Sequence, residues 1–122
     1  MTSSGTSTAP DPDCLFCKIV AGEIPATLVA ETPDTVAFRD INPQAPTHVL
    51  VIPRAHYRDI AAMSAADPAL TGRLATDAAA VAAQEGLTGF RLVFNTGAEV
   101  GQSVFHVHGH VLGGRPFGWP PG

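Results

Sequence analysis

Residues 103–114 read S-V-F-H-V-H-G-H-V-L-G-G and carry three of the five histidines of this 122-residue chain. His106, His108 and His110 follow one another at a spacing of two residues. Successive side chains of a β-strand point to opposite faces, so a strand would direct all three imidazoles to one face. A helix would align only the first with the last. The apolar neighbours and the glycines at both ends favour a strand, and we predict one over residues 103–114.

Composition and charge limit the classes of protein that fit this chain. Hydrophobic residues make up 45% and charged residues 15%, as in an ordinary globular domain, and the net charge of −4 argues against a nucleic-acid partner. A small phosphate ligand is compatible with this charge, because backbone N–H groups and histidines supply local positive potential. The sequence contains neither a long apolar run nor a signal-peptide pattern, which predicts a cytoplasmic protein with no membrane partner.

The remaining chain predicts one α+β domain over residues 13–122, preceded by a flexible tail over residues 1–12 that is rich in Ser, Thr and Pro. A short helix is expected from Asp13 to Gly22, and a long helix from Asp67 to Gly86. The last two strands should pair antiparallel, because the connection between them is too short for a crossover. Besides the histidine strand, strands are expected over residues 27–31, 35–40, 47–53 and 90–95.

Three imidazoles on one face fit either metal binding or nucleophilic catalysis. Histidines two residues apart on a strand can share a zinc ion, and one imidazole can also attack an electrophile while its neighbours set its tautomer. Asn95, Ser103 and the glycines at 97 and 101 flank the histidines, and such residues suit phosphate oxygens. Carboxylates, the usual hydrogen-bond partners of metal-bound histidine, are scarce nearby. We therefore favour phosphate chemistry over a catalytic three-histidine metal site.

The only two cysteines, Cys14 and Cys17, form a C-x-x-C pair at the start of the expected short helix. A thioredoxin-like redox pair would need a preceding strand in a βαβ unit, which the sequence lacks. Half of a zinc site and two inert small residues are the other interpretations, and the residues alone leave both open. His48 and His56, taken singly, are more often incidental than functional.

Residues 106–112, H-V-H-G-H-V-L, resemble the histidine triad motif H-φ-H-φ-H-φ-φ of the HIT superfamily, where φ is apolar. Residues 40–56, the lead-in G-Q-S-V-F-H and the closing W-P-P-G are similar to the HINT branch of nucleotide-binding HIT proteins. The resemblance covers residues 13–122. It implies a HIT-like α+β fold, a five-stranded antiparallel sheet with one long and one short helix, joined to a second sheet across a homodimer.

The resemblance implies a hydrolase that cleaves the P–N bond of purine nucleoside 5′-phosphoramidates through a nucleotidyl-histidine intermediate. His108 would be the nucleophile, His110 would bind the phosphate, His48 would support their hydrogen bonds, and Ser103 would hold phosphate oxygens or the leaving group. Asp40 would accept hydrogen bonds from the ribose hydroxyls. The residues implied for binding an AMP or GMP derivative are Phe16, Ile19, Phe38, Asp40, Ile41, Asn95, Gly101, Ser103, His108 and His110.

The resemblance also implies a structural zinc ion on Cys14, Cys17, His56 and His106, and no cofactor for catalysis. In the homodimers of this branch the C-terminal tail approaches the site of the other subunit, so Trp119 would influence leaving-group preference. Two other functions stay open: hydrolysis of dinucleoside polyphosphates, and a non-enzymatic nucleotide- or zinc-binding interaction module.

Gly109 departs from the motif, which usually has a large apolar residue at this position. In a strand Gly109 would point away from the histidines, so the catalytic face is expected to be intact. We expect packing volume to be left unfilled on the opposite face.

Overall fold

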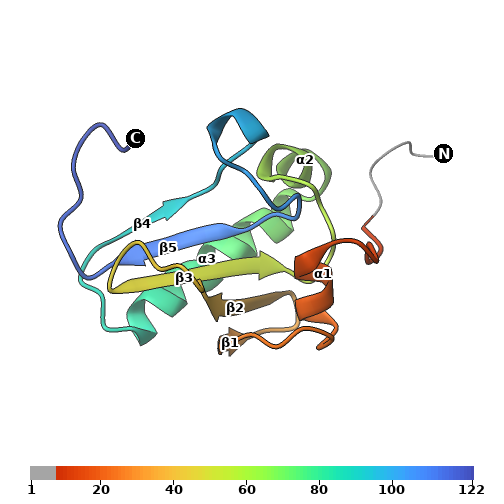
Figure 1. Ribbon diagram of the computed structural model, residues 1–122, viewed down its shortest axis with the longest axis horizontal. Coiled ribbons are helices and arrows are strands. Elements are labelled where there is room, and N and C mark those ends of the chain that lie inside the picture. The colour runs from red at the N-terminus through yellow and green to blue at the C-terminus, as the bar shows by residue number, and fades with distance from the viewer. Residues whose placement is uncertain (1–7) are drawn as a thin grey trace.

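Five strands form one antiparallel sheet in the computed structural model, which describes residues 8–122. The strands are β1 (Leu28–Glu31), β2 (Thr35–Arg39), β3 (Thr47–Pro53), β4 (Phe90–Val93) and β5 (Gly109–Gly113). Their order across the sheet is β1-β2-β3-β5-β4, so the last strand lies between β3 and β4 (Figure 1). The predicted α+β class and the antiparallel pairing of the last two strands are confirmed.

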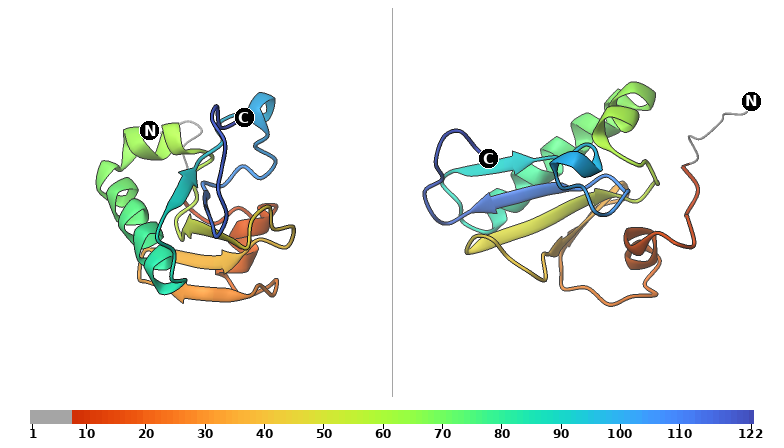
Figure 2. Two further views of the ribbon diagram at one scale, coloured as in Figure 1. Left: turned by 90° about the vertical axis from the view of Figure 1, so that its left-hand side faces the viewer. Right: turned by 45° about the horizontal axis from the view of Figure 1, so that its top comes forward.

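Helices cover both faces of the sheet. Figure 2 shows α3 (Pro68–Gln84) along one face and α1 (Leu15–Val20) on the other. The Asp67 side chain caps α3 by accepting a hydrogen bond from the N–H of Leu70, and Gly86 follows the helix with a φ of +74°. These start and stop signals were read correctly from the sequence. No helix within residues 8–122 is long and apolar enough to span a bilayer.

A further helix, α2 (Ile60–Ala66), lies between β3 and α3 and was not predicted from the sequence. Its signal was present, because the Asp59 side chain accepts a hydrogen bond from the N–H of Ala62 at 2.8 Å and an alanine-rich run follows. The helix buries the side chain of Met63 completely and leads directly into α3.

Two apolar clusters pack on opposite faces of the sheet. The cluster under α3 includes Val49, Val51, Leu74 and Val111. The cluster under α1 contains Phe16, Phe38, Leu50 and Ile52, together with both cysteines. Because β3 contributes to both clusters, every one of its residues is buried, as its continuous apolar sequence predicts.

The predicted histidine strand is wrong over residues 103–108, since β5 begins only at Gly109. The N–H of Val107 donates to the carbonyl of Tyr57 at 2.9 Å, and the carbonyl of His106 accepts from the His108 side chain. Neither group is therefore free for a strand ladder. The alternation nevertheless persists. Val107 and Val111 pack on the α3 side, whereas the rings of His106 and His108 contact Phe16 of α1.

The expectation of unfilled volume behind Gly109 is also wrong. A Cβ at this position would lie 2.9 Å from Leu92 Cδ1 and 3.0 Å from Phe94 Cε1 and Cζ. Two side chains therefore occupy the space that a larger residue at 109 would need.

The tail expected over residues 1–12 lies partly outside the described residues, which begin at residue 8. Within the described part, the carbonyl of Thr8 accepts a hydrogen bond from the N–H of His56 at 3.0 Å. The carbonyl of Asp11 accepts from the N–H of Cys14, also at 3.0 Å.

Candidate functional site

A cavity of about 660 Å³ lies between α1, the end of β2 and the histidine segment. Its walls are mainly apolar, and its polar lining includes Asp40, Ser103, His108 and His110, of which the two histidines have ring centroids 5.0 Å apart. Phe16 and Phe38 pack edge-on against each other in the wall, with ring centroids 5.4 Å apart. The lining residues are Leu15, Phe16, Ile19, Ile24, Pro25, Ala26, Thr27, Phe38, Arg39, Asp40, Ile41, Leu50, Ser103, Val104, His108 and His110.

One backbone hydrogen bond fixes the tautomer of His108. Its Nδ1 lies 2.8 Å from the carbonyl oxygen of His106, and a carbonyl oxygen can only accept, so Nδ1 carries the hydrogen. The neutral ring then has its lone pair on Nε2. An unprotonated imidazole nitrogen at the cavity is a competent nucleophile.

A chain of hydrogen bonds orients His110 in the same way. The N–H of Gln44 donates to His48 Nδ1 at 3.0 Å, so the hydrogen of His48 is on Nε2. That Nε2–H group donates to His110 Nδ1 at 2.9 Å, which leaves the hydrogen of His110 on Nε2. Among the described residues, His110 Nε2 is buried without any partner. It is a preset donor for an acceptor that the protein itself does not provide.

Burial keeps these imidazoles neutral near pH 7. It lowers the pKa of His108, and it lowers the pKa of His110 to about 4, with the neighbouring His108 and His48 adding to the effect. The pKa of His48 is also lowered by burial, against the opposing influence of the Asp40 carboxylate 3.4 Å away. Neutral rings keep both the lone pair of His108 and the donor of His110 available.

The structure brings most of the predicted nucleotide-binding residues to the cavity, but not all of them. Asn95 lies two residues beyond β4 and Gly101 closes a short 3-10 turn (Ala98–Val100), and neither lines the cavity among the described residues. His48 acts from behind His110. The side chain of Trp119 is 85% exposed and also lies away from the cavity lining.

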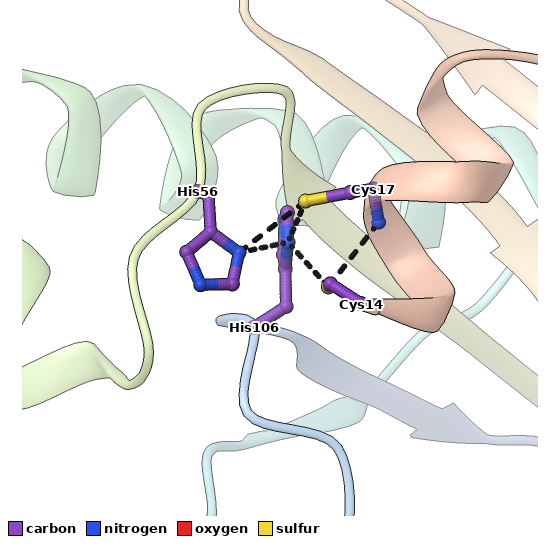
Figure 3. A group of neighbouring side chains, drawn as sticks. All are labelled: Cys14, Cys17, His56 and His106. Atoms are coloured by element: carbon purple, nitrogen blue, oxygen red, sulfur yellow. Dashed lines mark hydrogen bonds between the residues drawn. The ribbon is translucent and has the colours of Figure 1, made fainter. Parts of the chain in front are cut away.

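A second group, the Cys/His cluster of Cys14, Cys17, His56 and His106, lies at the opposite end of the histidine segment (Figure 3). The cysteines come from the start of α1, His56 from the loop after β3, and His106 from the segment before β5. His106 Nδ1 lies 3.4 Å from Cys14 Sγ, 3.5 Å from Cys17 Sγ and 3.2 Å from His56 Nδ1. Cys17 Sγ lies 3.3 Å from His56 Nδ1.

The Cys/His cluster crowds three neighbouring atoms around one nitrogen of His106. His106 Nε2 lies 2.8 Å from the carbonyl oxygen of Pro53 and must donate to it, so Nδ1 offers one lone pair to three neighbours. Tetrahedral zinc bonds of about 2.0–2.3 Å put ligand atoms about 3.3–3.8 Å apart, close to the observed separations. Two thiols and two imidazoles are the donor set that zinc prefers, so the residues fit a metal ion.

Metal binding would also change the protonation of Cys17. Burial raises the pKa of its thiol to about 11, so without a cation the sulfur keeps its proton. The N–H of Asp11 points to Cys17 Sγ at 3.5 Å, and the N–H of Cys17 points to Cys14 Sγ at 3.3 Å. Each sulfur thus has a backbone donor that would stabilise a thiolate.

Asp40, His48 and His110 also lie close enough together to suggest a metal site. Their geometry differs from that of the Cys/His cluster, because the 2.9 Å between His48 Nε2 and His110 Nδ1 is a hydrogen-bond distance and the tautomer chain explains it fully. We assign this group to hydrogen bonding.

Sequence comparison places the chain in a known family. The HIT domain matches residues 21–117, which is most of the chain. The chain belongs to the HIT family. The crystal structure of a HIT family hydrolase from Legionella pneumophila Philadelphia 1 is 51% identical, with a TM-score of 0.86 over 90% of this chain and 100% of that one.

Two curated HIT relatives carry informative names. The purine nucleoside phosphoramidase of Escherichia coli K12 is 45% identical over 108 residues, covering 87% of this chain and 91% of the relative. The 14 kDa zinc-binding protein of Zea mays is 47% identical over 115 residues, covering 92% of this chain and 90% of the relative.

Sequence reasoning missed several residues that shape this HIT site. Leu50 lies in the cavity wall because its backbone pairs with Phe38 on one side and His110 on the other. Gln102 is buried and braces the loop before Ser103. Its Oε1 accepts from the N–H of Gly97 at 2.8 Å, and its Nε2 donates to the carbonyl of Arg58 at 2.7 Å. A glutamine between glycine and serine gives no sequence signal for this role.

Proposed function

We propose that this chain hydrolyses the P–N bond of purine nucleoside 5′-phosphoramidates, with His108 as the nucleophile. The observation that carries the proposal is the pairing of complementary nitrogens at the polar end of the cavity. His108 has a lone pair on Nε2, and His110 has an unpartnered N–H donor, with ring centroids 5.0 Å apart. A nucleophile beside a preset donor suits attack at a phosphorus atom whose oxygens gain charge.

The reaction proceeds in two displacements. His108 Nε2 attacks phosphorus, and the electron pair of the P–N bond leaves with the nitrogen, which takes up a proton and departs as an amine. Water then attacks the nucleotidyl-histidine, the P–Nε2 bond breaks, and the nucleoside monophosphate leaves. His110 Nε2–H donates to a phosphate oxygen in both displacements, and Ser103 at the cavity lining is a second candidate donor.

The cavity suits the rest of a nucleotide. The aromatic wall of Phe16 and Phe38, extended by Ile19, provides an apolar surface for a purine base. The Asp40 carboxylate at the cavity can accept from two vicinal ribose hydroxyls, which favours a ribonucleotide over free phosphate. The name of the Escherichia coli relative, purine nucleoside phosphoramidase, agrees with this substrate class.

The test compares wild type with His108→Ala on adenosine 5′-phosphoramidate. The variant should lose turnover and the nucleotidyl adduct seen by mass spectrometry of acid-quenched wild type, while AMP binding by calorimetry persists. Phe105→Ala is the matched control, because Phe105 lies in the same segment but stacks under Arg58 rather than lining the cavity. Retained turnover in His108→Ala would defeat the nucleophile. Faster turnover of diadenosine polyphosphates would favour the dinucleoside reaction, and AMP binding without turnover would favour an interaction module.

We further propose that the Cys/His cluster holds a structural zinc ion. Four protein donors close a tetrahedral site and leave no position for substrate, so this metal would stabilise the fold and take no part in the chemical step. The name of the Zea mays relative agrees with zinc binding. Elemental analysis of protein purified without added metal should give one zinc per chain in wild type and less in Cys14→Ser. Equal zinc contents would contradict this assignment.

We also propose that the chain is a homodimer. The edge strand β4 has paired backbone groups on the β5 side only, and Phe90 on it is 41% exposed. Light scattering at micromolar concentration should give twice the monomer mass, and a monomer mass would refute the proposal.

A further inference from the structure

The nucleophile and the Cys/His cluster share one peptide group, the one that joins His106 to Val107. Its carbonyl oxygen accepts from His108 Nδ1–H at 2.8 Å, which fixes the reactive tautomer. Its N–H donates to the carbonyl of Tyr57 at 2.9 Å. The plane of this peptide is therefore held from both ends, and its orientation decides which nitrogen of His108 faces the cavity.

The residues that hold the His106–Val107 peptide in place are a member of the Cys/His cluster, His106, and the chain neighbour of another member, Tyr57. Tyr57 follows His56 in the chain. His106 supplies the carbonyl itself, and its ring is held on one side by Pro53 through Nε2 and on the other by the cluster through Nδ1. Holding His56 and His106 together thus aligns the donor and the acceptor of the Tyr57–Val107 hydrogen bond.

The two cysteines also influence the position of Phe16, a residue of the cavity wall. Phe16 lies between Cys14 and Cys17 on α1 (Figure 3 shows the position of the cysteines on this helix). The Phe16 ring packs edge-on against His108, with centroids 5.0 Å apart at an interplanar angle of 90°. Because α1 has only 6 residues, the cysteines that begin it also set where this ring lies.

We propose that metal bound at the Cys/His cluster positions His108 for catalysis, by orienting the His106–Val107 peptide and the Phe16 ring. The inference rests on the proposed metal site and nucleophile. Without metal, the cysteines are joined to the histidines only by thiol–imidazole contacts of 3.3–3.5 Å; a thiol is a weak hydrogen-bond donor, so the cluster loosens. The peptide is then free to turn, and His108 exchanges between its two tautomers. His106 and the cluster are positioning groups, because none of them lines the cavity.

The primary test reads the tautomer directly. The full-length chain is labelled with ¹⁵N-histidine, and the His108 nitrogen resonances are compared at one fixed pH in the zinc-loaded form, the chelated form and the form reloaded with zinc. We expect a pure Nδ1–H tautomer with zinc, a mixture without it, and recovery on reloading. The single-turnover rate of nucleotidyl transfer to His108 should fall by about 10- to 100-fold without metal, the scale expected for misplaced reactive groups.

Two comparisons separate positioning from general stability. Leu74→Ala removes a fully buried side chain from the α3 cluster, away from the metal, and should lower the unfolding midpoint while leaving the His108 resonances unchanged. If chelation unfolds the chain, the cadmium-loaded form replaces it. Cadmium keeps the four ligands but lengthens the bonds, and should shift the His108 resonances and slow nucleotidyl transfer.

An unchanged tautomer and rate in the folded metal-free chain would overturn the inference and leave zinc binding intact. If the metal-free chain unfolds, identical His108 resonances and identical rates of nucleotidyl transfer in the zinc and cadmium forms would overturn the inference. Failure of the proposed function is separate, because it appears as turnover by His108→Ala and does not alter the tautomer measurement.

Discussion

Phe94 and Gly109 should behave as one packing unit, in which an aromatic ring replaces the side chain that the histidine motif usually has. The perturbation is a double-mutant cycle of Phe94→Val, Gly109→Leu and the double variant. A Cβ at Gly109 would lie 3.0 Å from Phe94 Cε1 and Cζ and 2.9 Å from Leu92 Cδ1, so a leucine enters only if the Phe94 ring is removed and the flexible end of Leu92 shifts. Overpacking of this kind costs about 1–3 kcal/mol.

The opposite change leaves a gap. Truncating a fully buried Phe to Ala costs about 3–5 kcal/mol, and Phe94→Val, which keeps part of a half-buried side chain, should cost about 1–2 kcal/mol. In the double variant leucine occupies the space of the ring, so the free energy of unfolding should return to within about 1 kcal/mol of wild type. The resulting coupling energy is about 1–5 kcal/mol in favour of the double variant.

Urea unfolding followed by circular dichroism measures the four free energies, provided the slopes agree. The control pairs Phe94→Val with Gly72→Ala on α3, where an added Cβ meets nothing within 4 Å, and these two effects should add. Additivity within about 0.5 kcal/mol for the Phe94–Gly109 pair would refute the shared-space argument. So would a harmless Gly109→Leu.

Three further predictions concern the catalytic end. His48→Ala removes the donor to His110 Nδ1 and should lower kcat/KM by about 10- to 100-fold. His48→Gln should recover part of that loss. Equal values of kcat/KM in the two variants would contradict the role of the His48–His110 hydrogen bond in fixing the His110 tautomer. Asp40→Asn should raise KM by about tenfold or more for ribonucleotide substrates and abolish their advantage over 2′-deoxy analogues, measured by steady-state kinetics. The buried His110 has a pKa of about 4, below the ordinary 6.5, so it stays neutral until the pH nears 4. The contribution of His110 to kcat/KM should therefore persist below pH 6.5. The free energy of unfolding should fall below pH 6.5, because the His110 ring becomes protonated in the unfolded chain before it does in the folded one. A pH profile of kcat/KM that falls with a midpoint at 6.5 would contradict the role of His110.

The sequence predicted the elements whose signals are local. Asp67 and Pro68 mark the start of α3, and the continuous apolar run of β3 predicts its complete burial. The start of the histidine strand could not be placed, because Val107 donates its N–H group to Tyr57, far away in the sequence, instead of to a neighbouring strand. The periodicity of a sequence predicts the face to which a side chain points, but not the group with which its backbone forms hydrogen bonds.

The sequence predicted many of the residues that form the site, but not the hydrogen bonds and contacts that join them. The tautomer of His110 depends on Gln44 and His48, and no spacing in the sequence relates those residues to it. The space behind Gly109 is occupied by Leu92 and Phe94, and a pattern within one strand does not reveal the side chains of its neighbours. The Cys/His cluster joins three distant segments, so the C-x-x-C pair alone left its use undecided.

The position of β5 has a consequence for synthesis of the chain. β5 is made after β3 and β4, yet it lies between them in the sheet. Until β5 leaves the ribosome, β3, whose residues are all buried in the folded chain, has an open edge. A chain that stalls before residue 103 therefore exposes an aggregation-prone edge of β3 and lacks His106, His108 and His110.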